Sequence, residues 1–199
     1  MSSDEGAASP QVAVDPTPTL AMRALSRLEE EPPLIVITGM SGAGRSTAAK
    51  VLEDLGWYVV DNLPTQLLKA LQDLRSHGLA DSATPMRLAA VIDARAGRMS
   101  GSLSHTLGEL RAGGDRPVVV FLDATDEALV RRFESVRRPH PLQGSGRLMD
   151  AIVRERTLMA DLRASADLII DTSGFNVHQL AAKISSLLSA AVSSRVRLA

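Results

Sequence analysis

The chain has 199 residues, enough for one α/β domain with a sizeable core. Hydrophobic residues at 45% and charged residues at 23% match ordinary globular composition and argue against wholesale disorder, a collagen-like repeat or a coiled-coil rod. A net charge of −1 argues against a global attraction to nucleic acid or anionic membrane, and the absence of cysteine excludes a disulfide framework, a thiolate metal site and a cysteine nucleophile.

The first 31 residues differ in composition from the rest of the chain. They begin with Ser, Asp, Ala, Gly and Pro, and residues 20–31 have only weak helical spacing. We predict a disordered or loosely helical tail over 1–31 and one domain over 32–199. The tail lacks the features of a signal peptide, and no apolar run approaches the roughly 20 residues that cross a bilayer. We therefore expect a cytoplasmic protein with no membrane partner.

Five short apolar runs predict buried strands. They cover residues 34–38, 57–60, 88–92, 118–122 and 168–170, and are followed by Gly39, Asp61, Asp93, Asp123 and Asp171. Stretches with helical spacing lie between and after them, at 46–55, 64–77, 98–112, 127–135, 148–162 and 177–191. This alternation predicts a three-layer α/β sandwich with a mostly parallel five-stranded sheet. Ligands of such sheets bind beyond the carboxyl ends of the strands, where the aspartates fall.

The segment after the first predicted strand matches the phosphate-binding pattern G-x-x-x-x-G-K-[ST], except that arginine replaces lysine. Its residues are Gly39, Met40, Ser41, Gly42, Ala43, Gly44, Arg45 and Ser46. The glycines let backbone N–H groups surround a phosphate, and the following helix N-terminus adds a positive dipole. Ser46 can place its hydroxyl on a Mg²⁺ ion bridging the β- and γ-phosphates. The guanidinium of Arg45 is bulkier than the ammonium of the usual lysine. We expect the loop to bind nucleotide nevertheless, and the sequence does not determine the rate of hydrolysis.

Several further blocks have a distinctive pattern. They read LEDLGWYVVDNLP (52–64), IDAR (92–95), FLDA (121–124), RRF (131–133), RRPHPL (137–142), ADLIIDTS (166–173) and VHQL (177–180). With the phosphate loop, they resemble the blocks of the RapZ-like (YvcJ-like) family of P-loop nucleotide-binding proteins, in the family's order, from residue 34 to about 188.

The resemblance implies a kinase-like P-loop NTPase fold that binds ATP and GTP and hydrolyses them slowly. It places ATP on the phosphate loop and GTP on Asp93, Ala94, Arg95 and Ala96. Family members continue into a second domain, which their RNA-binding members use for RNA, so we expect this sequence to comprise the nucleotide-binding half. The implied role is that of an adapter or sensor, with a protein partner or RNA reached through the absent C-terminal domain.

Three aspartates are candidates for the site. Asp93 ends the strand expected beside the phosphate loop, so we assign it as a Mg²⁺ ligand and catalytic carboxylate. Asp61 is the competing candidate, and an Asx turn ahead of Pro64 is its structural explanation. Asp123 is expected to begin the next helix, with Thr125 as the cap.

Residues 131–163 carry eight arginines against four acids. The middle of this segment, 139–146, contains Pro and Gly and is interpreted as a mobile loop. A basic loop facing a phosphate site has the composition of a kinase lid, so we assign catalytic roles to Arg137 and Arg138, together with Arg45. The same arginines can instead hold RNA phosphates or an acidic partner, and i,i+4 pairs explain some of them.

Three functions follow from these features. The leading hypothesis is a regulatory domain that binds ATP or GTP with Mg²⁺. The alternative is a small-molecule or nucleoside kinase, in which residues 171–174 would contact adenine through backbone groups. A nucleic-acid-binding module ranks last, because the net charge is −1 and aromatic residues make up only 3%. Nucleotide preference and oligomeric state stay open.

Overall fold

The computed structural model describes residues 33–77, 86–93, 97–136 and 138–193. The predicted tail over 1–31 lies outside the described residues. So do four of the candidate site residues, namely Ala94, Arg95, Ala96 and Arg137.

The centre of the described structure is a five-stranded sheet, and all of its strand pairs are parallel. The strands are β1 (Ile35–Gly39), β2 (Tyr58–Val60), β3 (Leu88–Val91), β4 (Val118–Asp123) and β5 (Leu168–Asp171). Their order is β2-β3-β1-β4-β5, so the strand that leads into the phosphate loop lies at the centre. The predicted strands and their parallel arrangement are confirmed.

The central strand shows why these sequences form a sheet covered on both sides. All five residues of β1 are buried, as expected of a strand whose two faces are both packed. Ile35 is in register with Ala89 of β3 and with Val118 of β4. The carboxyl end of β1 therefore lies between the carboxyl ends of β3 and β4. Asp93 follows β3 and so lies at the same edge of the sheet.

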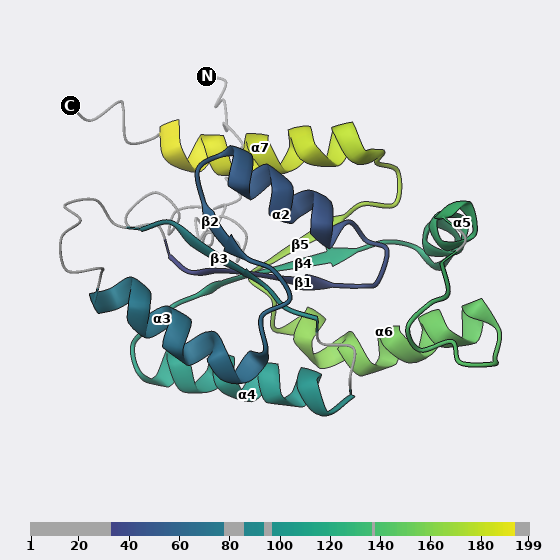
Figure 1. Cartoon of the computed structure of the whole chain (residues 1–199), viewed down its shortest axis with the longest axis horizontal. Coiled ribbons are helices and arrows are strands. Elements are labelled where there is room, and N and C mark those ends of the chain that lie inside the picture. Colours follow the sequence, from purple (N-terminus) through teal and green to yellow (C-terminus); the bar gives the residue numbers. More distant parts are fainter. Residues whose placement is uncertain (1–32, 78–85, 94–96, 137, 194–199) are drawn as a thin grey trace, which may run out of the picture.

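Helices cover both faces of the sheet in three layers (Figure 1). They are α2 (Arg45–Asp54), α3 (Leu68–His77), α4 (Gly97–Ala112), α5 (Asp126–Val136), α6 (Leu148–Ala164) and α7 (Val177–Ser193). The first and last of these lie on one face, and α3, α4 and α6 lie on the other. A short 3-10 helix, Thr65–Leu67, begins the segment that the sequence predicts as one helix over 64–77.

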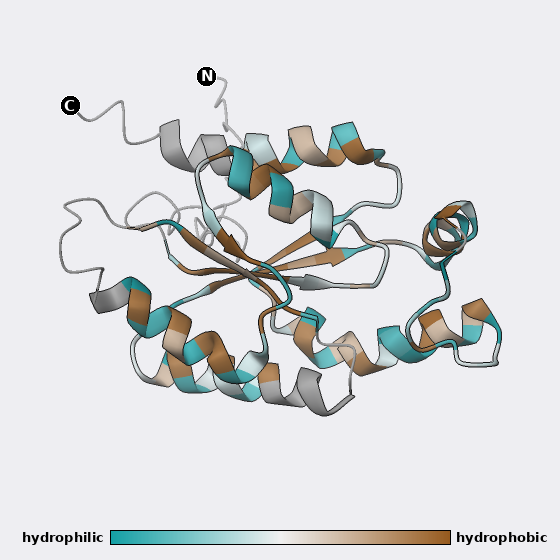
Figure 2. Ribbon diagram, viewed as in Figure 1, coloured by the Kyte–Doolittle hydropathy of each residue, from teal (hydrophilic) through white to brown (hydrophobic). Residues whose placement is uncertain are grey.

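The core lies between the sheet and the helices. Figure 2 shows apolar residues along the strands, with apolar and polar residues alternating along the helices. Val36 and Phe121, on neighbouring strands, are completely buried, and the buried side chains form one cluster on both sides of the sheet. Among the described helices, none has the length and hydropathy needed to span a membrane.

Candidate functional site

Glycines in the loop between β1 and α2 are required by its backbone geometry. Gly39 has φ +140, and a Cβ there would lie 2.1 Å from the carbonyl oxygen of Leu122. Gly44 has φ +103, and its Cβ would lie 2.4 Å from Leu180. Residues that carry a Cβ atom rarely adopt such φ values, so both positions need glycine. The loop thus has the tight turn that the phosphate-binding pattern predicts.

Contacts from α5 and from the segment after β5 hold two carbonyl groups of this loop. The Arg132 Nη1 group donates to the Gly42 oxygen at 3.0 Å, and the Thr172 hydroxyl donates to the Ala43 oxygen at 3.0 Å. Arg132 also donates through Nη2 to the carbonyl oxygens of Thr172 and Phe175. One arginine of α5 therefore joins the phosphate loop to the segment that follows β5. The sequence analysis missed this role, because nothing in a charged helix predicts a contact with residues 90 and 40 positions away.

Arg45 and Asp93 form an ion pair beside the phosphate loop. Arg45 Nη1 lies 3.3 Å from Asp93 Oδ1 and donates to the Ile92 carbonyl oxygen at 3.3 Å. The two side chains are only 14% and 16% exposed. Burial lowers the pKa of Arg45, and the nearby carboxylates of Glu155 and Asp61 oppose that shift. The guanidinium stays charged near neutral pH, because arginine loses its proton only in strong base.

A cleft of about 770 Å³ opens over the loop and lies within the size range of small-ligand sites. Its lining includes Asp61, Asn62 and Asp93, which follow β2 and β3, and Arg138 and Phe175, which follow α5 and β5. The structure thus brings the phosphate loop, Asp93 and Arg138 to one cleft, as the sequence analysis expects of a nucleotide site.

The residues assigned to Mg²⁺ have suitable chemistry for that ion. The Ser46 hydroxyl and the Asp93 carboxylate offer oxygen, the donor that Mg²⁺ prefers. Both residues line the cleft. In the described part of the chain, no three histidine, aspartate or glutamate side chains gather into a cluster that could hold a metal ion. Two oxygen donors suit Mg²⁺, because protein sites commonly hold this ion through one or two side chains together with substrate phosphates.

Asp61 makes a local hydrogen bond and also lines the cleft. Its Oδ1 atom accepts a hydrogen bond from the N–H of the next residue, Asn62, at 2.8 Å. The Leu63 N–H, which an Asx turn would use, donates to the Val91 carbonyl oxygen instead, so the Asx turn expected ahead of Pro64 is not formed. Asn62 has φ +53, a left-handed conformation that is uncommon for residues other than glycine. Asp61 also lines the cleft, so the turn presents its carboxylate to the same space as the phosphate loop.

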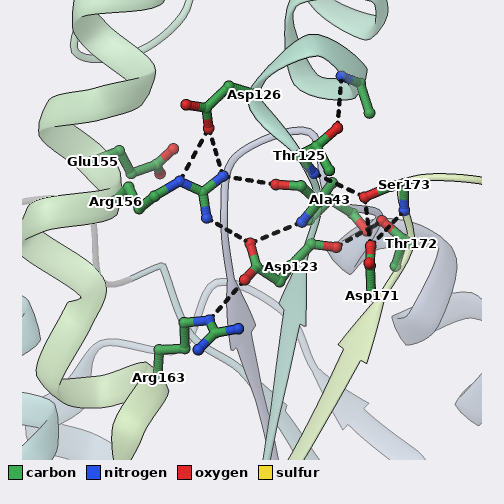
Figure 3. Close-up of polar contacts among 12 residues, drawn as sticks. Ala43, Asp123, Thr125, Asp126, Glu155, Arg156, Arg163, Asp171, Thr172 and Ser173 are labelled. Atoms are coloured by element: carbon green, nitrogen blue, oxygen red, sulfur yellow. Dashed lines mark hydrogen bonds and ion pairs between the residues drawn. The ribbon is translucent and has the colours of Figure 1, made fainter.

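Asp123 belongs to the scaffold. Figure 3 shows Arg156 and Arg163 reaching from α6 to this carboxylate at the end of β4. Arg156 Nη1 lies 2.9 Å from Oδ1, and Arg163 Nε lies 2.7 Å from Oδ2. The Thr125 hydroxyl accepts from the Ala128 N–H at 3.3 Å, which confirms the predicted cap of α5. Two of the arginines in the basic segment are therefore structural.

The turn after β5 lies beside a second hollow. Asp171 accepts hydrogen bonds from the hydroxyl and the N–H of Ser173, which lower the pKa of Asp171. Ser173 and Gly174 line a hollow of about 470 Å³ that shares Arg132 and Phe175 with the main cleft. Adenine contact at 171–174 stays a prediction.

A buried histidine–carboxylate pair lies beneath the phosphate loop. His140 Nε2 is 3.0 Å from Glu155 Oε2, and neither side chain has solvent exposure. The sequence analysis counted Glu155 among the four acids of residues 131–163 and gave it no role. Its spacing held a signal, because Glu155 falls on the buried stripe of α6 together with Ile152, Met159 and Leu162.

Comparisons with known proteins agree with this geometry. The family model described as the RapZ-like N-terminal domain matches residues 33–191. A nucleotide-binding protein of Streptomyces coelicolor is 55% identical over 153 residues, which is 77% of this chain and 50% of that protein. A nucleotide-binding protein of Thermobifida fusca is 54% identical over 166 residues, 83% of this chain and 55% of that protein. The chain thus spans about half the length of these relatives.

Solved structures share the fold at low sequence identity. The shikimate kinase of Acinetobacter baumannii, solved with shikimate, has a TM-score of 0.51 and 19% identity, covering 83% of this chain and 97% of that one. A gluconokinase of Sinorhizobium meliloti has a TM-score of 0.50 and 15% identity, covering 83% and 96%. These likenesses confirm the predicted kinase-like P-loop NTPase fold and say nothing of substrate.

Proposed function

The chain belongs to the RapZ-like family, and from that premise we propose that it is a regulatory nucleotide-binding domain that holds ATP or GTP with Mg²⁺ and hydrolyses it slowly. The observation that supports this proposal best is the Arg45–Asp93 ion pair beside the phosphate loop. The pair places two charged groups that neutralise each other next to a loop whose geometry suits phosphate.

Binding follows from groups that the chain already directs to the cleft. Backbone N–H groups of the phosphate loop and the N-terminus of α2 attract phosphate oxygens. Arg138, which is exposed and lines the cleft, adds positive charge from the opposite side. Ser46 and Asp93 would hold Mg²⁺, which supplies charge neutralisation between the β- and γ-phosphates when bound. Arg137 is proposed to act with Arg138, although it lies outside the described residues.

Slow hydrolysis follows from the same ion pair. A carboxylate next to Mg²⁺ helps to order the ion's water shell, and Asp93 shares its negative charge with Arg45. For Arg45 to approach the phosphates, it must give up bonds to Asp93 and to the Ile92 carbonyl group. The pair therefore leaves Arg45 and Asp93 less available for hydrolysis.

The two nucleotide assignments implied by the family concern one cleft. Asp93, the described member of the segment assigned to GTP, lines the same cleft as the phosphate loop assigned to ATP. This supports one nucleotide site contacted by both segments. Ala94, Arg95 and Ala96 are kept as proposed contacts of that site.

The proposed output is regulation of a partner. Occupancy of the cleft would change the loops that surround it and so control a protein or RNA bound through a C-terminal domain. This adapter or sensor role rests on the family resemblance, because the chain spans about half of its relatives.

A calorimetric titration of the chain with ATP and with GTP, each with Mg²⁺, tests the proposal. We expect saturable binding with a stoichiometry of one, and turnover that is slow compared with that of a metabolic kinase. No binding by a folded sample contradicts the proposal. ATP turnover strongly stimulated by one compound of a metabolite and nucleoside panel would instead establish the kinase alternative.

A further inference from the structure

Glu155 has a complete set of hydrogen bonds although it is buried beneath the phosphate loop. Its Oε1 atom accepts from the Ser41 hydroxyl at 2.6 Å, and Oε2 accepts from the Ser41 N–H at 3.1 Å. The same Oε2 atom lies 3.0 Å from His140 Nε2. A buried carboxylate costs several kcal/mol unless it is bonded in this way. The arrangement therefore depends on both of its partners staying in place.

The protonation of the histidine follows from its second hydrogen bond. His140 Nδ1 accepts from the Leu142 N–H at 3.1 Å, so that nitrogen carries no proton. The proton of the neutral ring is then on Nε2, which donates it to Glu155. This bonding fixes the orientation of the ring and joins Glu155 to the loop between α5 and α6.

The two partners of Glu155 belong to two different loops that line the nucleotide cleft. Ser41 is the third residue of the phosphate loop. His140 belongs to residues 138–147, here called the basic loop, in which Arg138, Pro139 and Pro141 line the cleft. A buried carboxylate of α6 thus connects the element that would grip phosphate to the element that would face it.

A second contact joins the same two loops. The His140 ring packs edge-on against Phe133, with ring centroids 4.9 Å apart and an interplanar angle of 61°. Phe133 in turn lies 3.2 Å from the position that a Cβ on Gly42 would take. A movement of the phosphate loop would therefore shift His140 by two routes, one through Glu155 and one through Phe133.

We propose that Glu155 is a positioning residue that couples the phosphate loop to the basic loop through its hydrogen bonds with Ser41 and His140. The proposal rests on nucleotide binding at the phosphate loop. Because breaking the bonds to either partner leaves a buried carboxylate with fewer hydrogen bonds, the two loops favour matched positions. A nucleotide that fixes the phosphate loop then also fixes the basic loop, and an occupant of the basic loop changes nucleotide affinity by the same factor.

Amide hydrogen exchange of the full chain, with and without ATP and Mg²⁺, tests this coupling in three variants. Glu155→Gln removes the charge at constant size, and Ser41→Ala removes only the hydroxyl bond. Asp161→Asn is the matched control, because it removes a negative charge from an exposed position on the same helix. Exchange is followed in peptides covering 138–147, and affinity is measured by calorimetry on the same samples.

In the wild type and in Asp161→Asn, we expect ATP to slow exchange of the basic loop at least about threefold. In Glu155→Gln we expect that response to disappear and affinity to fall about tenfold. In Ser41→Ala the response should be reduced and affinity should fall about threefold. Loss of the exchange response at saturating ATP distinguishes coupling from simple weakening of the site.

The outcomes separate this proposal from the one on which it rests. A folded wild type that binds no nucleotide overturns both. A wild type that binds ATP but shows the same exchange response as Glu155→Gln overturns the coupling alone. If Glu155→Gln does not fold, Ser41→Ala decides, and an exchange response in that variant equal to the wild type contradicts the proposal.

Discussion

The guanidinium of Arg45, the first residue of α2, lies 3.3 Å from the carboxylate of Asp93, which follows β3. The two residues were each expected to act on phosphate or Mg²⁺, and the structure shows them bound to each other. Their pairing means that the positive charge of the phosphate loop and the acidic end of the neighbouring strand are not independent. A change at either residue should alter the behaviour of the other.

The Arg45→Lys variant tests whether this pair limits hydrolysis. Lysine keeps the charge but replaces the planar guanidinium, whose Nη1 atom contacts both Asp93 and the Ile92 carbonyl group, with a compact ammonium on a flexible stem. We expect single-turnover hydrolysis of bound ATP to rise about tenfold, the effect of lowering the barrier by about 1.4 kcal/mol. Lys50→Arg, an exposed exchange of the same two residue types on α2, is the control and should leave the rate unchanged. An unchanged rate in Arg45→Lys would show that positioning of water sets the limit.

The glycine at the end of β1 is expected to be essential for folding. In Gly39→Ala, the new methyl group would lie 2.1 Å from a backbone oxygen that cannot move aside. We expect a loss of more than about 4 kcal/mol in the free energy of unfolding, measured in urea. Gly56→Ala is the matched control, because Gly56 has φ +80 with open space around it. That variant should lose only about 1 kcal/mol, and equal losses in both would contradict the steric explanation.

The sequence predicted the features that local patterns determine. Five apolar runs were sufficient for the strands, and the alternation with helices was sufficient for the parallel sheet. The glycines at 39 and 44, the two that the phosphate-binding pattern specifies, both have positive φ. Such features depend on residues within a few positions of one another, which is why a single sequence reveals them.

The contacts that organise the site could not be predicted in this way. Arg45 meets a residue 47 positions away in the chain, and Ser41 meets Glu155 at a separation of 114. Those pairings depend on how α6 and β3 pack against the phosphate loop, which no local pattern specifies. Glu155 shows the difficulty. Its charge predicts an exposed side chain, whereas its position on the apolar stripe of α6 predicts a buried one.

The network around Asp123 should matter for stability and not for nucleotide binding. Asp123→Asn keeps the size of the side chain but weakens its bonds with Arg156 and Arg163. We expect a loss of about 1 to 2 kcal/mol in the free energy of unfolding, a modest value because both arginines are partly exposed. ATP affinity measured by calorimetry should stay within about twofold. A large loss of affinity in a folded variant would show that Asp123 belongs to the site.

Arg138 should have the opposite profile. It is exposed and lines the cleft, so Arg138→Ala removes a positive charge that faces the nucleotide. We expect ATP affinity to fall about fivefold and the free energy of unfolding to change by less than about 0.5 kcal/mol. The control is Arg116→Ala, an exposed arginine that precedes β4 at the opposite end of the sheet. If both variants bind ATP as the wild type does, Arg138 has no part in binding.

The most direct measurement of the central claim, that the phosphate loop is the nucleotide site, is a calorimetric titration of ATP into the wild type and Ser46→Ala, with Mg²⁺ and with a chelator. Ser46 is exposed at the start of α2, so its replacement should not disturb folding. We expect Ser46→Ala to bind ATP about tenfold more weakly than the wild type when Mg²⁺ is present, and equally when it is removed. Equal affinities of the two proteins in the presence of Mg²⁺ would contradict the claim.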